Sequence, residues 1–167
     1  MTLQPFDPIR ALRVLIDHGV EFVVIGGIAG RLMSSPTVTN DLDVCYDRNP
    51  ENLERLATAL QSIHARLRGV DETVPFQLDP ATFQAGDSFT FVTDAGNLDV
   101  LGTPSGTSGY PDLIATANDV DLEDLIVKVC NIEDLIRMKR AAARPKDLIE
   151  LEILNAVRGE MERGPDN

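Results

Sequence analysis

The pattern of apolar and polar positions predicts alternating helices and strands along the first half of the chain. Apolar residues share one face over 8–19 and again over 50–68, at the spacing of amphipathic helices. The segment 20–25 is apolar and rich in β-branched residues, and 39–46 alternates in steps of two, so both are predicted strands. The pair Gly26-Gly27 ends the first strand, and a short helix is expected over 28–34.

The second half of the chain carries a hairpin signal followed by a long helical signal. The strand-like segments 89–92 and 98–102 flank the turn sequence TDAGN. A loop over 103–109, a helix and a strand over 124–130 are expected next. Asn131 is a suitable cap for a helix that runs to about residue 160 and breaks near Pro145.

This order of elements predicts an α/β fold in which a mixed sheet is flanked by helices. The 167 residues are expected to form a single domain, with a core over 20–130 and a helical C-terminal extension over 131–160. No apolar run approaches the roughly 18 to 20 residues that span a bilayer, and the N-terminus lacks the layout of a signal peptide. A cytoplasmic protein without a membrane partner is therefore expected.

Cysteine and histidine offer little material for a metal site or a disulfide framework. Cys45 and Cys130 lie in apolar, strand-like segments, which favours buried free thiols. His18 and His64 fall in separate helical patterns, where surface positions are expected. A histidine-based catalytic triad has almost nothing to build on.

The charge of the chain is strongly negative but unevenly distributed. A net charge of −12 argues against a protein that binds nucleic acid over its whole surface. A ten-residue window nevertheless holds five of the fifteen basic residues: Arg137, Lys139, Arg140, Arg144 and Lys146. Such a patch can hold a triphosphate or one stretch of RNA, or it can be a solvated helix face.

Three aspartates are the strongest candidates for chemistry. Asp41 and Asp43 are two residues apart on a predicted strand and so project from the same face, and Asp99 lies on a strand of its own. Three clustered carboxylates repel one another unless a cation lies between them. Mg²⁺ or Mn²⁺, which bind oxygen ligands, would offset this repulsion. Taken alone, a D-x-D pattern can also be an accident in an acidic protein. The Gly26-Gly27 turn upstream can cradle phosphate and strengthens the chemical interpretation.

Two segments resemble a known superfamily. The run VIGGIAGRLMSSPTVTNDLDV resembles the signature of the DNA polymerase beta-like nucleotidyltransferases, in which an apolar strand, a Gly-Gly or Gly-Ser turn and Asp-x-Asp follow one another. The run IEDLIRMKRAAARPKDLIELEIL resembles the C-terminal motif of the toxin-type minimal nucleotidyltransferases of abortive-infection and toxin–antitoxin systems. The resemblance covers about residues 20–155.

The resemblance implies a role for each matching position. Asp41, Asp43 and Asp99 become metal ligands and catalytic carboxylates, together with Lys139 as a catalytic cation. The implied nucleotide contacts come from six positions: Gly26, Gly27, Lys139, Arg144, Lys146 and Asp147. Gly27 stands where many catalytic members have serine, and the loss of that hydroxyl implies weakened activity.

The C-terminal motif also makes physical sense alone. On a helix, Lys139, Lys146 and Asp147 can share a face toward the carboxylates. The side chains expected to pack inward are Leu135, Met138, Ala142 and Leu148. Arg31, four residues after Gly27, either reaches the phosphates or pairs with an acidic neighbour.

The leading hypothesis is a metal-dependent nucleotidyltransferase that transfers an NMP from a nucleoside triphosphate to a hydroxyl. The toxin-like resemblance favours tRNA or a protein as acceptor and implies a cognate antitoxin, while a small molecule such as an aminoglycoside stays open. The second hypothesis is a nucleotidyltransferase-like binding or regulatory module of a toxin–antitoxin pair, without turnover. The third is an α/β domain whose carboxylates are only surface charges.

Overall fold

The computed structural model describes residues 5–71 and 73–164, and in this part of the chain seven strands form one mixed sheet. The strands are β1 (Phe22–Ile25), β2 (Asp41–Tyr46), β3 (Arg66–Leu67), β4 (Ser88–Thr93), β5 (Gly96–Leu101), β6 (Asn118–Leu122) and β7 (Leu125–Val129). Their spatial order is β3-β4-β5-β2-β1-β7-β6. The neighbours β2 and β5, and also β1 and β7, run parallel, while the remaining pairs are antiparallel.

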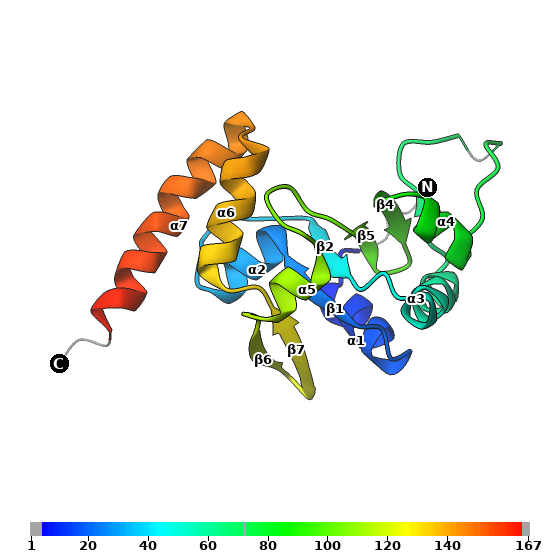
Figure 1. Cartoon of the computed structure of the whole chain (residues 1–167), viewed down its shortest axis with the longest axis horizontal. Coiled ribbons are helices and arrows are strands. Elements are labelled where there is room, and N and C mark those ends of the chain that lie inside the picture. Colours follow the sequence, from blue (N-terminus) through cyan, green and yellow to red (C-terminus); the bar gives the residue numbers. More distant parts are fainter. Residues whose placement is uncertain (1–4, 72, 165–167) are drawn as a thin grey trace.

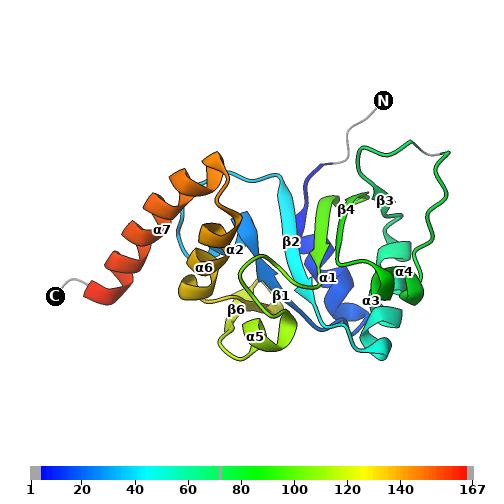
Figure 2. The same ribbon diagram turned by 45° about the horizontal axis from the view of Figure 1, so that its top comes forward.

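Helices flank this sheet, as the sequence predicts (Figure 1). They are α1 (Pro8–Asp17), α2 (Gly26–Leu32), α3 (Pro50–Ser62), α4 (Pro80–Ala85), α5 (Tyr110–Ile114), α6 (Ile132–Ala142) and α7 (Pro145–Arg163). In both ribbon views, α6 and α7 lie at one end of the molecule and α3 and α4 at the other (Figures 1 and 2). None of the helices within the described residues is both long enough and apolar enough to cross a membrane.

Local sequence explains where the long helices begin. The side chains of Asp7, Asn49 and Asn131 each accept a hydrogen bond from the backbone N–H three residues later, at the starts of α1, α3 and α6. Proline occupies the first turn of α1 and α3, where its missing N–H costs nothing. These caps agree with the helix starts predicted from the sequence.

The predicted helix over 50–68 is too long. Helix α3 ends at Ser62, and His64 adopts a left-handed φ of 52°, which turns the chain out of the helix. The following residues form β3, which pairs with β4 at the edge of the sheet. The predicted start of α2 is also wrong, because this helix begins at Gly26 rather than at residue 28.

The break expected near Pro145 is present and separates α6 from α7. Ala143 is left-handed, with a φ of 50°, and Pro145 starts the new helix. The side chains of Leu135 and Met138 are buried as expected. Leu148 is a correction: it is 57% exposed, because α7 packs mainly on α6 and presents this residue to solvent.

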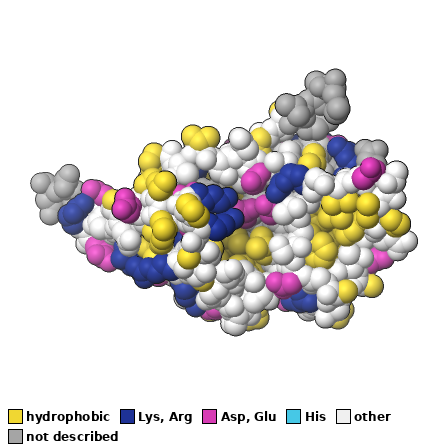
Figure 3. Space-filling model, turned by 90° about the horizontal axis from the view of Figure 1, so that it is seen from above, with side chains coloured by type: hydrophobic (Ala, Val, Ile, Leu, Met, Phe, Trp, Pro, Cys, Tyr) yellow, Lys and Arg dark blue, Asp and Glu magenta, His cyan; other side chains and the backbone are white. Residues whose placement is uncertain are grey.

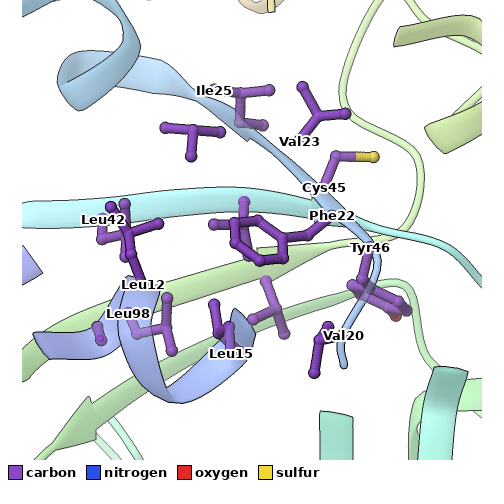
Figure 4. Packing of buried hydrophobic residues seen from close by; sticks show 14 of the residues in the cluster. Leu12, Leu15, Val20, Phe22, Val23, Ile25, Leu42, Cys45, Tyr46 and Leu98 are labelled. Atoms are coloured by element: carbon purple, nitrogen blue, oxygen red, sulfur yellow. The ribbon is translucent and has the colours of Figure 1, made fainter. Parts of the chain in front are cut away.

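One part of the hydrophobic core lies on the side of the central strands that carries Leu42, Val44 and Leu98. Leu12 and Leu15 of α1 point into the same cluster (Figure 4). Because side chains alternate along a strand, Asp41, Asp43 and Asp99 lie on the opposite side of the sheet. The core thus fixes the register of the strands that carry the acidic residues.

Both cysteines are buried free thiols, as the sequence predicts. Burial raises the pKa of each thiol, Cys45 and Cys130, to about 12. The two groups therefore behave as small apolar side chains rather than as reactive or metal-binding thiolates.

Candidate active site

The pairing of β2 with β5 brings the three predicted carboxylates together. In this parallel pair Asp43 lies opposite Asp99, and Asp41 lies opposite Asn97. The amide of Asn97 donates a hydrogen bond of 2.9 Å to Oδ1 of Asp41. Residues opposite one another in a sheet share a face, so the three acidic side chains form one cluster.

The cluster is short of positive charge. Burial, followed by the neighbouring Asp99, raises the pKa of Asp43 to about 8. Burial also raises the pKa of Asp99. Ionised Asp99 disfavours a second negative charge on Asp43, so Asp43 is the carboxyl that holds a proton. At neutral pH, the metal-free cluster therefore binds a proton to relieve its repulsion.

Arg68 completes the cluster, although the sequence alone does not predict it there. Its Nη2 donates a hydrogen bond of 3.0 Å to Oδ1 of Asp99, and its Nη1 lies 3.7 Å from Oδ1 of Asp41. Arg68 directly follows β3. The helix predicted over 50–68 places this residue at a charged helix end, not beside the carboxylates. The one local feature at this position is an arginine followed by Gly69, and this pattern does not predict a contact with Asp99.

The turn after β1 has no room for side chains. Gly26 has a φ of 69°, and a Cβ built there would lie 2.1 Å from Oδ2 of Asp43. A Cβ on Gly27 would lie 2.8 Å from the Cβ of Thr39. The backbone N–H of Asp41 in turn donates to Thr39 Oγ1. Glycine at position 26 lets the turn approach Asp43, and glycine at position 27 lets it approach Thr39, where a serine side chain would meet the same close contact.

Helices α6 and α7 supply the basic side of the site. Lys139 Nζ lies 3.5 Å from Oδ1 of Asp147 and 3.0 Å from Oε2 of Glu150, and the lysine side chain is only 13% exposed. The Nε of Arg144 donates to Oδ2 of Asp147 at 2.8 Å, and its backbone N–H donates to the same oxygen at 3.0 Å. Asp147 thus forms ion pairs with both Lys139 and Arg144 at the junction of α6 and α7.

Asp147 is fully buried and ionised. Burial by itself raises its pKa, but the hydrogen bonds from the side chain and backbone of Arg144 outweigh this and hold the pKa below its usual value. A buried carboxylate of this kind persists only because it is paired and hydrogen-bonded. Its two cationic partners are consequently held in fixed positions.

A cleft of about 480 Å³ lies between the acidic cluster and the two helices. Among its lining residues are most of the predicted site positions: Gly26, Asp41, Asp43, Asp99, Lys139, Arg144, Lys146 and Asp147. Basic and acidic side chains meet around a hollow in the middle of this face (Figure 3). The cations of α6 and α7, together with Asp147, therefore line the same cleft as the three carboxylates.

Some predicted residues lie outside this cleft. Gly27 does not line it, and Arg31 is exposed on α2 away from the lining. Arg137, part of the basic window, is paired with Asp112 and Asp134 at 3.1 Å in each case. Only three of the five basic residues in 137–146 face the cleft: Lys139, Arg144 and Lys146.

The donor set of the acidic cluster fits a divalent cation in chemistry but is not arranged as a ready site. Over 5–71 and 73–164, no three histidine, cysteine or acidic side chains stand together in the geometry of a metal site. Arg68 and Asn97 bind the oxygens of Asp41 and Asp99 that face the cluster. The chemistry nevertheless suits Mg²⁺ or Mn²⁺, because the carboxylates are hard oxygen donors and the cluster is deficient in cations.

Comparison with solved structures identifies the fold. The crystal structure of the lincosamide antibiotic adenylyltransferase LnuA, lincomycin-bound, matches with a TM-score of 0.60 at 10% identity, over 90% of this chain and 95% of that chain. The solution structure of the antibiotic-resistance factor ANT(2'')-Ia matches with a TM-score of 0.54 at 11% identity, over 93% and 89%. No protein-family model and no curated protein matches the chain. The chain therefore has the predicted nucleotidyltransferase fold, and the toxin-type branch stays a prediction.

Proposed function

We propose that this protein transfers an NMP from a nucleoside triphosphate to a hydroxyl acceptor and releases pyrophosphate. One observation carries the proposal: a carboxylate cluster and a set of cations face each other across a single cleft of about 480 Å³. The fold shared with an adenylyltransferase adds support. A nucleoside triphosphate needs cations around its phosphates and metal-binding carboxylates at the reacting phosphate. This cleft offers both kinds of group.

The basic wall suits the triphosphate. Lys139 and Arg144 are held by the buried Asp147, and Lys146 lies beside them at the cleft. Fixed cations bind phosphate oxygens with little loss of side-chain entropy, and the planar guanidinium of Arg144 can bind two oxygens at once. The close approach at Gly26 leaves room for phosphate beside Asp43.

The acidic wall suits the reacting end. Mg²⁺ or Mn²⁺ would be held by Asp41, Asp43 and Asp99, and when bound it neutralises charge on the phosphates and lowers the pKa of a coordinated hydroxyl. Asp99 is the carboxylate that pairs with Arg68 and lies on the strand next to β4. It is accordingly our choice as the group that accepts the proton of the acceptor hydroxyl.

Two classes of acceptor have support from different observations. The exposed Arg140 and Lys146 suit a stretch of tRNA, the acceptor that the toxin-like resemblance favours together with a protein side chain. A small-molecule acceptor is supported by the nearly full coverage of two structures whose names refer to antibiotics. A cytoplasmic location fits either class, and a cognate antitoxin stays a prediction from the resemblance.

The alternative is a binding or regulatory module without turnover. Its support is the tight glycine turn that lacks the serine hydroxyl, together with the guanidinium of Arg68 on the carboxylates. Such a module binds Mg²⁺ and nucleotide but transfers nothing.

The test is incubation of the protein with each α-³²P-labelled nucleoside triphosphate and Mg²⁺. Total RNA, cell protein, or a panel of lincosamides and aminoglycosides is added in parallel. We expect label on one acceptor class, and its loss in Asp41→Asn/Asp43→Asn. The control Asp17→Asn/Asp121→Asn removes two exposed carboxylates outside the cleft and is expected to keep activity. Mg²⁺-dependent nucleotide binding without any transfer favours the module, and absence of nucleotide binding contradicts both proposals.

A further inference from the structure

Arg68 reaches the acidic cluster from the edge of the sheet. Its backbone N–H donates to the carbonyl of Thr90 on β4 at 2.9 Å, which extends the pairing of β3 by one residue. Thr90 lies directly opposite Asp99 on the next strand. The side chain of Arg68 therefore spans one strand to place its guanidinium on the face that carries the carboxylates.

The guanidinium of Arg68 lies close to two carboxylates, but one of its nitrogens has no hydrogen-bond partner among the described residues. Nη2 binds Oδ1 of Asp99 at 3.0 Å, whereas Nη1 is 3.7 Å from Oδ1 of Asp41, too far for a hydrogen bond. Nη1 is nevertheless buried and has no hydrogen-bond partner among the described residues. An arginine with a purely structural role has a hydrogen-bond partner for each buried N–H group. Because Nη1 of Arg68 has none, this residue is held mainly by the negative charge of the cluster.

The same oxygens are the natural ligands of a divalent cation. Oδ1 of Asp99 and Oδ1 of Asp41 face Arg68, and a metal that takes these oxygens as ligands needs the guanidinium to move away from them. A guanidinium and a metal ion beside the same oxygens also repel each other. The Arg68 side chain is 30% exposed and therefore has a path toward solvent.

We propose that Arg68 is an internal counter-ion that competes with the divalent metal and is released from Asp99 and Asp41 when the metal binds. This inference rests on the metal site of the proposed function. Without metal, the guanidinium offsets part of the negative charge of the cluster. Entry of the metal then frees Asp99 from its ion pair, and only in that state is the carboxylate available to an acceptor hydroxyl.

The test is Mn²⁺ binding without nucleotide, measured from the electron paramagnetic resonance signal of free Mn²⁺. We expect Arg68→Gln to bind Mn²⁺ at least tenfold more tightly than the wild type, because the competing cation is gone. Arg66→Gln is the matched control, since Arg66 lies two residues away on the same edge, carries the same charge and is exposed outside the cleft. It is expected to leave Mn²⁺ affinity within twofold.

Further variants separate competition from structural support. Adding Asp43→Asn to Arg68→Gln is expected to abolish the gained binding, and Arg68→Lys is expected to bind Mn²⁺ with intermediate affinity. Equal or weaker Mn²⁺ binding by a folded Arg68→Gln protein overturns the inference, as does absence of Mn²⁺ binding in both wild type and variant. Circular dichroism establishes that each variant is folded.

A measurement on the wild type covers the case in which the Arg68 variants do not fold. Mg²⁺ is titrated while the arginine side-chain ¹H–¹⁵N signals are recorded. We expect one guanidinium signal to change with the metal, and unchanged arginine signals at saturating Mg²⁺ overturn the inference. Neither readout requires turnover. Failed NMP transfer with tighter Mn²⁺ binding in Arg68→Gln contradicts only the proposed function, whereas normal transfer with unchanged Mn²⁺ binding contradicts only this inference.

Discussion

At the scale of single residues, Gly26 combines an unusual backbone conformation with close contact to a carboxylate of the site. Its φ of 69° is left-handed, and an added Cβ would lie 2.1 Å from Oδ2 of Asp43. Gly26→Ala should therefore lose about 1–2 kcal/mol of unfolding free energy from the backbone conformation alone. Displacement of Asp43 should add to this loss and weaken binding of Mg²⁺ and ATP. Urea unfolding and isothermal titration calorimetry measure the two effects.

Gly69→Ala provides the matched control for this prediction. Gly69 has a φ of 75°, but a Cβ added there would have nothing within 4 Å. The two variants share the backbone penalty and differ in the clash with Asp43. Equal losses of stability, with ATP binding retained in both, would show that the close approach at Gly26 has no role in the site.

The raised pKa of Asp43 predicts an unusual dependence of stability on pH. Burial and the neighbouring carboxylates raise this pKa to about 8 in the folded, metal-free protein. In the unfolded chain it returns to about 4. Between these values the folded state binds a proton that the unfolded state lacks, so the contribution of Asp43 to stability falls as pH rises and levels off above about 8.

Carboxylates such as Asp112 and Asp147 have lowered pKa values and the opposite slope, so the effect of Asp43 is isolated as a difference between proteins. Asp43→Asn removes this titration, and its stability relative to the wild type should rise steadily from pH 5 to pH 8 in the presence of EDTA. Urea unfolding at several pH values measures the difference. Parallel profiles would mean that Asp43 is ionised throughout this range and that the cluster does not hold a proton.

At the scale of elements, the sequence predicted the parts of the site that depend on local signals. Asp41 and Asp43 alternate with apolar residues on β2, and Asn131 and Pro145 mark the starts of α6 and α7. Lys139, Arg144 and Asp147 were placed through the resemblance and meet at the junction of these helices. Their roles in nucleotide binding stay predictions.

Arg68 could not be found in this way, because its position depends on pairing between distant segments. A two-residue strand such as β3 has no periodicity to detect, and the charged end of the preceding segment has the pattern of a continued helix. The register of β3, β4 and β5 then sets which carboxylate the arginine meets. The prediction that Leu148 is buried is wrong for a related reason, since helical spacing does not reveal whether another element covers that face.

The junction of α6 and α7 gives a prediction at this scale. Asp147 accepts hydrogen bonds from the backbone and side chain of Arg144 and pairs with Lys139. Asp147→Asn should destabilise the protein by about 2 kcal/mol, the value of a hydrogen bond to a charged group. Loosening of the two cations should also weaken Mg-ATP binding about tenfold.

Glu152→Gln removes the same charge from an exposed position of α7 and serves as the control. Urea unfolding and calorimetry with Mg-ATP are compared for both variants and the wild type. If Asp147→Asn lost stability but kept its affinity for Mg-ATP, Asp147 would be a structural residue of the helix junction only.

At the scale of the whole molecule, charge separation is the main feature. The chain has a net charge of −12, yet three cations line one wall of the cleft opposite three carboxylates. Two unit charges 4 Å apart interact by about 4 kcal/mol in partly buried surroundings. A bare triphosphate is therefore attracted by the cations and repelled by the ionised carboxylates of the cluster.

A divalent metal changes this balance, which gives a prediction for the intact protein. ATP should bind at least about tenfold more weakly in EDTA than in Mg²⁺, a difference of about 1.4 kcal/mol. In Asp41→Asn/Asp43→Asn the repelling charge of Asp41 is removed, and Asp43, which holds a proton at neutral pH without metal, can no longer ionise. Metal-free ATP should therefore bind more tightly than it does to the wild type, while the dependence on Mg²⁺ disappears. Calorimetry at constant ionic strength separates this effect from general screening. Equal affinity of the wild type for ATP in EDTA and in Mg²⁺ would place the triphosphate away from the carboxylates and contradict the two-walled site.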